Sequence, residues 1–109
     1  MTTKSTCEFN RLMYLLDTNN IEQARLLLKQ QSLLIRNNLF DKFDNNDNTL
    51  LHRYILRNQE DAVHLLLEYG ASVYSLNKYG WLPIHLAAYY GQNRTIYFNL
   101  NILFNMNLR

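Results

Sequence analysis

The sequence has little of three residue types that shape small folds: it contains one cysteine, one proline and three glycines among 109 residues. The single cysteine, Cys7, excludes an internal disulfide and a cysteine-rich zinc site. Long hydrophobic runs are absent too, since aliphatic stretches such as residues 26–28 are far shorter than the ~18 residues of a membrane span. The N-terminus shows no apolar signal-peptide segment. We therefore expect a soluble, intracellular protein that is located in the cytoplasm, and a nuclear location also agrees with the sequence. We expect no membrane partner.

The sequence also lacks a large excess of charge of either sign. Eleven lysines and arginines face nine aspartates and glutamates, which leaves a net charge of +2, and no stretch gathers the basic residues. Binding to the nucleic-acid backbone or to anionic lipid depends on such a cluster. We expect no nucleic-acid partner. Hydrophobic residues make up 48% of the chain, which is enough for the packed core of one small domain.

Asparagine, by contrast, is abundant, with 15 copies that are interleaved with leucine and tyrosine. Many copies fall where a turn is expected, among them the pairs at 19–20, 37–38 and 45–46. Asparagine tolerates positive φ better than most residues, so it can replace glycine in turns. We interpret these asparagines as turn formers and not as a low-complexity segment.

The chain repeats itself. When the sequence is shifted by 33 positions, residues 50–52 align with 83–85 and residues 56–58 with 89–91. An earlier copy aligns at a shift of 39, where residues 24–28 lie over 63–67, so the loop between these two copies is about six residues longer. A period near 33 is typical of stacked helical repeats that bury their apolar faces against each other.

Each unit is predicted to contain two short helices. In the middle unit Asn48 or Thr49 provides an N-cap oxygen, and the first helix runs over 50–56. The second helix runs from about 60 to 69, with carboxylates in its first turn that complement the helix dipole. Gly70 ends it in a left-handed conformation, and the nine residues that follow are predicted to form an extended finger.

Three segments together resemble the ankyrin repeat. Residues 80–91, with the sequence GWLPIHLAAYYG, are similar to the family's G-x-T-P-L-H-x-A-A-x-x-G core, with leucine at the threonine place. Residues 65–73 are similar to its L-L-L-x-x-G-A-D-V run, with serine at the aspartate place, and residues 49–52 to its T-P-L-H start, with leucine at the proline place. The resemblance is strong over 44–98 and weak over 9–36.

This resemblance implies an all-α ankyrin-repeat solenoid, a short array of helix–turn–helix–finger units with an irregular C-terminal end. The single domain, residues 1–109, would comprise a degenerate repeat with a long loop at 9–43, a second repeat at 44–76 and an incomplete third at 77–109. In this family the motif histidine hydrogen-bonds between the turn backbones of neighbouring repeats. The positions to which the resemblance gives a structural role are Thr49, His52, Gly70, Gly80, Pro83, His85 and Gly91.

The sequence also departs from the family pattern. In the first unit Met13 and Gln31 replace the motif histidine and the terminal glycine. In the second, Arg53 and Tyr54 occupy places where the family usually has small residues, so we expect this unit to pack loosely. Residues 99–108 alternate polar and apolar side chains, which predicts a strand, and no capping helix closes the array.

Candidates for chemistry are few. His52 and His85 occupy equivalent places in successive units, about one ~10 Å helix diameter apart, and no cysteine or carboxylate accompanies them as a zinc ligand. Asp41, Asp44 and Asp47 lack the glycine and closing glutamate of a calcium loop, so we interpret them as solvated loop residues or helix caps. No phosphate-binding loop or nucleophile elbow is present. We expect no enzyme, no metal and no cofactor.

The resemblance places four aromatic residues on a fingertip and on the inner face of a helix, the side with which ankyrin repeats contact partners. They are Tyr79, Trp81, Tyr89 and Tyr90, and the middle unit offers Asn46, Asn48 and Arg57 at corresponding places. Large aromatics are enriched at interface hot spots. The alternative is that Trp81 and one tyrosine simply pack on the adjoining finger.

Two functions remain open. The first is a non-enzymatic ankyrin-repeat module that binds an unidentified protein partner through fingers and inner helices. The second is an N-terminal or truncated piece of a longer ankyrin-repeat protein, such as a viral or pathogen protein that acts on its host, without an activity of its own. Fold does not imply function, so the sequence leaves both the partner and the oligomeric state undetermined.

Overall fold

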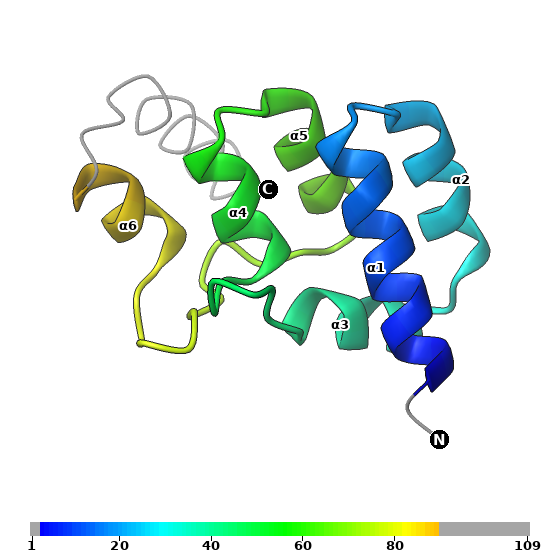
Figure 1. The fold of residues 1–109 in the computed structure, drawn as a ribbon, viewed down its shortest axis with the longest axis horizontal. Helices are drawn as coiled ribbons and strands as arrows, with labels where there is room; N and C mark the ends of the chain where they lie inside the picture. Colours follow the sequence, from blue (N-terminus) through cyan, green and yellow to red (C-terminus); the bar gives the residue numbers. More distant parts are fainter. Residues whose placement is uncertain (1–2, 90–109) are drawn as a thin grey trace.

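The computed structural model describes residues 3–89, and within them the secondary structure consists of helices and turns (Figure 1). The all-α prediction is confirmed. The helices are α1 (Thr3–Asp17), α2 (Ile21–Gln30), α3 (Leu33–Asp41), α4 (Leu50–Leu56), α5 (Glu60–Glu68) and α6 (Pro83–Tyr89).

The helices stack in two layers, with α1, α4 and α6 in one layer and α2 and α5 behind them (Figure 1). Short turns connect α1 to α2 and α4 to α5, so each of these pairs forms a helical hairpin whose two members contact each other. Neighbouring hairpins contact through α2 and α5, and α4 also packs against α6. The described part is therefore a short stack of helix pairs.

The backbone repeats with the two offsets that the sequence indicated. Asn19 and Asn58, 39 positions apart, have φ values of 62° and 58° in the turns between paired helices. Asp47 and Gly80, 33 positions apart, have φ values of 64° and 83° in the turns that precede α4 and α6. Non-glycine residues adopt this conformation at a cost that is lowest for Asn and Asp. Asparagine and aspartate thus replace glycine at three of these four turns.

The middle unit agrees closely with its prediction. Helix α4 spans the predicted residues, and the hydroxyl oxygen of Thr49 accepts a hydrogen bond from the backbone N–H of His52 at 3.4 Å. Helix α5 ends at Glu68, one residue before the predicted end, and Gly70 follows with φ of 106°. Local capping and turn residues therefore determine this hairpin.

Helix α3 was not predicted, because the sequence indicated a long loop with a turn at Asn37–Asn38. Instead, the side chain of Ser32 caps a helix by accepting from the N–H of Ile35 at 3.4 Å. Leu39 and Phe40 are buried, and α3 packs against α1. Burial of two large apolar side chains, each favourable by roughly 1.5–3 kcal/mol, outweighs the weak helix propensity of asparagine.

The core runs continuously through both layers. Its fully buried leucine and isoleucine members come from α1, α2, α3, α4 and α5, and they include Leu12, Leu16, Leu28, Leu39, Leu50, Ile55, Leu65 and Leu66. None of the helices within residues 3–89 is both long and apolar enough to cross a membrane. Tyr90, Gly91 and the strand predicted at 99–108 lie outside the described residues.

Candidate partner-binding face

Two fingers with the same turn geometry precede α4 and α6. In the first finger, residues 42–49, Oδ1 of Asp44 accepts from the N–H groups two and four residues later at 2.8 and 3.0 Å. In the second, residues 71–82, Oδ1 of Asn77 accepts from the equivalent N–H groups at 3.0 and 2.9 Å. Asp44 was expected to be solvated or to cap a helix, but it is buried, because its carboxylate organises the turn.

His52 connects α4 to the second finger. Its side chain is fully buried, with Nδ1 2.6 Å from the hydroxyl oxygen of Thr49 and Nε2 2.7 Å from the carbonyl oxygen of Trp81. Because a carbonyl only accepts, Nε2 donates and Nδ1 of the neutral ring accepts from the threonine. Burial lowers the pKa of His52, although the Trp81 carbonyl and the charge of Asp44 act in the opposite direction. The neutral ring therefore holds this finger in place.

The two fingers are also joined directly. The amide of Asn77 donates from Nδ2 to Oδ1 of Asn48 at 3.0 Å, and the hydroxyl of Tyr79 donates to Oδ2 of Asp47 at 2.8 Å. The backbone N–H of Lys78 donates to the carbonyl of Asp47 at 3.0 Å. Asn48 is only 8% exposed. Its prediction as a partner contact therefore needs correction, because the side chain is used between the fingers.

Exposed aromatic rings gather at the second finger and α6. Tyr79 is 69% exposed and Tyr89 is 70% exposed. The ring of Trp81 is partly buried and meets the ring of Tyr89 edge-on, with centroids 5.3 Å apart and an interplanar angle of 76°. Trp81 thus packs on a tyrosine of α6, whereas the alternative interpretation had placed it on the adjoining finger, and that tyrosine keeps most of its own surface exposed.

The remaining predicted positions are more varied. Asn46 and Arg57 are exposed, and Nε of Arg57 donates to Oε1 of Gln59 at 2.6 Å. Pro83 is buried at the start of α6. His85 is exposed, and its side chain makes no hydrogen bond to another residue within 3–89. In the described part of the chain, His85 thus lacks the connection that His52 makes.

A partly buried polar cluster lies where loose packing was predicted. The guanidinium of Arg53 donates to both carboxylate oxygens of Asp17, at 3.0 and 2.7 Å, and to Oδ2 of Asp44 at 3.0 Å. The hydroxyl of Tyr54, a fully buried residue, donates to the carbonyl of Met13 at 3.0 Å and to Oδ1 of Asp17 at 2.8 Å. The prediction was wrong, because these two large side chains connect α1, α4 and the first finger.

The cluster shifts the ionisation of its members. Burial disfavours the ionised carboxylate of Asp17, but the hydrogen bonds from Arg53 and Tyr54 and the positive charges nearby outweigh it and lower its pKa. The hydrogen bond to Asp17 raises the pKa of Arg53, and burial together with the same carboxylate raises the pKa of Tyr54. The carboxylate and the guanidinium therefore remain charged at neutral pH, and the phenol remains neutral.

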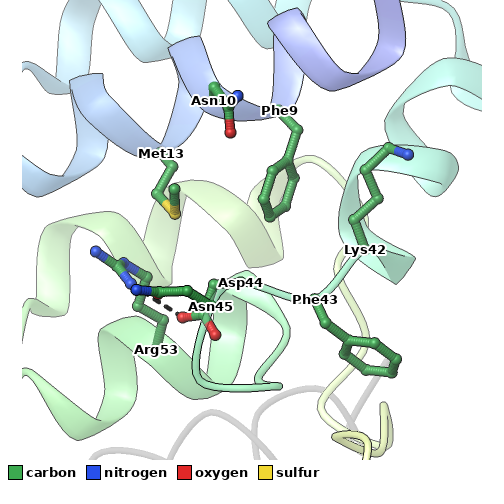
Figure 2. A pocket seen from close by; sticks show the side chains of 8 residues that line it. All are labelled: Phe9, Asn10, Met13, Lys42, Phe43, Asp44, Asn45 and Arg53. Atoms are coloured by element: carbon green, nitrogen blue, oxygen red, sulfur yellow. Dashed lines mark hydrogen bonds and ion pairs between the residues drawn. The ribbon is translucent and has the colours of Figure 1, made fainter. Parts of the chain in front are cut away.

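A hollow of about 580 Å³ opens beside this cluster, between α1, α4 and the first finger (Figure 2). In Figure 2 the side chains of Phe9 and Met13 extend from α1 toward the loop that carries Asp44 and Asn45. The residues that line it are Phe9, Asn10, Met13, Lys42, Phe43, Asp44, Asn45 and Arg53. Sequence reasoning missed this hollow, and the methionine at the motif-histidine place was the one signal of it.

Repeated helix pairs with equivalent fingers define a helical repeat array. Residues 51–100 match a family model described as ankyrin repeats in many copies. Within residues 51–100 the chain therefore carries ankyrin repeats, as its sequence motifs indicated.

Known relatives agree with this assignment. An ankyrin repeat protein of fowlpox virus is 41% identical over 69 residues, and ankyrin repeat domain-containing protein 13C of Xenopus tropicalis is 35% identical over 69 residues. Ankyrin repeat and SOCS box protein 2 of mouse is 45% identical over 38 residues. These alignments cover 63%, 63% and 35% of this chain but only 11%, 14% and 6% of the respective relatives. No solved structure matches at comparable significance.

Proposed function

We propose that this chain is a non-enzymatic ankyrin-repeat module that binds a protein partner through its fingers and inner helices. The observation that carries the proposal is the aromatic group on the second finger and α6, in which Tyr79 and Tyr89 are exposed and the partly buried Trp81 packs against Tyr89. Aromatic side chains bury a large area for little loss of conformational entropy, which is why they dominate interface hot spots.

The rigidity of the fingers supports the same function. His52, Asn48 and Asp47 each hold the second finger through a hydrogen bond. A surface that is ordered before binding loses less conformational entropy when a partner arrives, and more of its contact energy appears as affinity. The fingers are therefore suited to recognition.

The ionisable groups near this face support binding over catalysis. Both ring nitrogens of His52 are occupied, and the carboxylates of Asp17 and Asp44 are paired with Arg53. A general acid or base needs access to the proton that it transfers. These groups instead stabilise the face to which a protein would bind.

The test is affinity capture with the intact chain as bait, followed by measurement of the captured protein's affinity. The double variant Trp81→Ala/Tyr89→Ala is expected to weaken binding by about thirtyfold or more, because truncating one hot-spot residue costs ~2 kcal/mol or more. Far-UV circular dichroism should remain helical. Tyr14→Ala is the matched control, since Tyr14 is 65% exposed and lies on α1, which α4 separates from α6 (Figure 1). Undiminished binding by the double variant would contradict the proposal.

A further inference from the structure

We propose that the hollow between α1, α4 and the first finger is the anchor site for an acidic peptide segment of a partner protein. The segment would insert a large apolar side chain into the hollow, and a carboxylate of the neighbouring residue in the segment would remain at its edge. This inference rests on the proposed function, because it assigns a chemistry to part of the partner-binding face. The anchor site lies at the first finger and the exposed aromatic group at the second, so an experiment can refute either proposal without refuting the other.

The hollow follows from the replacement of the motif histidine by methionine in the first unit. Met13 lies 39 positions before His52, the same offset that relates the turns at Asn19 and Asn58. At the second junction His52 reaches across to the carbonyl of Trp81 and closes the space between helix and finger. A thioether has no hydrogen to donate, so Met13 cannot make that link. The space beside Met13 therefore stays open.

Another interaction keeps the first finger in position without filling this space. Asp44, in the turn, pairs with Arg53 of α4 at 3.0 Å, and Arg53 pairs with Asp17 of α1 at 2.7 Å. The dashed line in Figure 2 marks the contact between Asp44 and Arg53. The hollow thus has a fixed wall although it lacks the histidine.

The lining suits an apolar side chain with a polar backbone beside it. Phe9 is 5% exposed, and Met13 next to it is partly buried and flexible enough to adapt to the shape of a guest. Asn10 and Asn45 are exposed, and their amides can donate to and accept from a peptide backbone. Phe43, 43% exposed, adds apolar surface at the edge.

The charged side chains that line the hollow determine which charge a peptide segment must carry to bind there. The lining contains one carboxylate, Asp44, whose side chain is 1% exposed and already paired with Arg53. Arg53 is shared by two carboxylates. Lys42 is the lining charge that has no ion pair with any residue of the described part of the chain. An acidic segment would pair with Lys42, whereas a basic one would meet repulsion without a free carboxylate in compensation.

The experiment titrates the full-length chain, labelled with ¹⁵N, with three terminally blocked peptides. The probe is Gly-Leu-Glu-Glu-Gly, and the comparison peptides are Gly-Leu-Lys-Lys-Gly and Gly-Ala-Glu-Glu-Gly. The probe is expected to shift the amide signals of Asn10, Met13 and Asn45 saturably. Each comparison peptide is expected to bind at least about tenfold more weakly, because it lacks the charge or the anchor.

A charge reversal tests the same assignment from the protein side. Lys42→Glu is expected to weaken binding of the probe by about tenfold, and added salt should weaken it in the unaltered chain. Lys29→Glu is the control, since it makes the same change in charge at an exposed position of α2 away from the hollow. It should bind like the unaltered chain.

Three outcomes would overturn the proposal: no saturable shift with the probe, equal binding by Lys42→Glu, or shifts at Trp81 and Tyr89 in place of the hollow. The last outcome would leave the proposed function intact and refute only the anchor site. Conversely, shifts at the hollow together with unchanged partner binding by the Trp81→Ala/Tyr89→Ala variant would support the anchor site and refute the aromatic face.

Discussion

His52 shows how one side chain can set the distance between two repeats. Its imidazole is long enough to reach from α4 to the Trp81 carbonyl, and it has a second nitrogen for the hydroxyl of Thr49. Burying a polar ring is costly unless its hydrogen bonds are made, and here both are. The same burial makes this residue sensitive to pH.

Stability is expected to fall on mild acidification because of His52. Its pKa is lowered in the folded chain, while the unfolded chain keeps the ordinary value of about 6.5, so the unfolded state binds more protons as the pH falls below that value. The contribution is fully present above about pH 6.5 and is lost as the pH drops through the folded-state pKa. Urea unfolding between pH 7 and 5 should show this decline.

His52→Gln provides the comparison. It should lower the free energy of unfolding by roughly 1–3 kcal/mol at pH 7, through unsatisfied partners, and should flatten the pH dependence below 6.5. His85→Gln, at the equivalent but exposed position, should change the stability little. An unchanged pH dependence in His52→Gln would refute the assignment to this ring.

Gly70 is a second position where one residue decides local structure. Its φ of 106° lies in a region that L side chains rarely adopt, although a Cβ at this position would meet no heavy atom within 4 Å apart from those of the glycine and its two chain neighbours. Gly70→Val should therefore cost more than ~1 kcal/mol through backbone strain alone. Gly70→Asn is expected to be milder, since asparagine tolerates positive φ better. Thermal melts of the three chains test this order, and equal melting temperatures would contradict it.

At the scale of elements, α1 and α4 are joined by polar contacts as well as by the core. Asp17, at the end of α1, receives hydrogen bonds from Arg53 and Tyr54, both on α4. The first finger joins the same cluster through Asp44. Two hairpins and a finger are thus fixed in one arrangement by a few directional bonds, and directional bonds specify geometry better than apolar contacts do.

Asp17→Asn tests this connection. The amide keeps the size of the carboxylate but removes its charge and one acceptor, so the free energy of unfolding should fall by roughly 1–3 kcal/mol, as for a broken charged hydrogen bond. Because the pKa of Asp17 is lowered, its contribution is present above about pH 4 and lost as the pH falls further. Asp61→Asn, at an exposed position in the first turn of α5, is the control and should lower the free energy of unfolding only by the helix-dipole contribution, about 0.3–1 kcal/mol.

At the scale of the whole molecule, the proposed binding surface of the fingers and the inner helices α1, α4 and α6 has two different regions. One carries exposed aromatic rings on the second finger, and the other is the hollow beside Lys42. A partner that contacted both would bury an apolar anchor and a carboxylate at one region and aromatic surface at the other. The overall affinity of a partner that engaged both regions at once would exceed its affinity for either region alone.

The sequence by itself determined the features that depend on neighbours along the chain. These are the repeat offsets, the bounds of α4, the turn at Asn19 and the end of α5 before Gly70. Each follows from capping, from local backbone preference or from a hydrophobic period. Such effects act over a few residues, so a pattern read in one dimension is sufficient to predict them.

Tertiary structure decided the rest. Helix α3 forms because Leu39 and Phe40 are buried, although its asparagines favour a turn. Arg53 strengthens the unit it was expected to loosen, because a carboxylate 36 residues earlier, Asp17, reaches it in space. The hollow opens at Met13 because a finger that begins 29 residues later lies over it. Burial and pairing between residues so far apart in sequence depend on how the helix pairs stack, and that arrangement exists only in the folded chain.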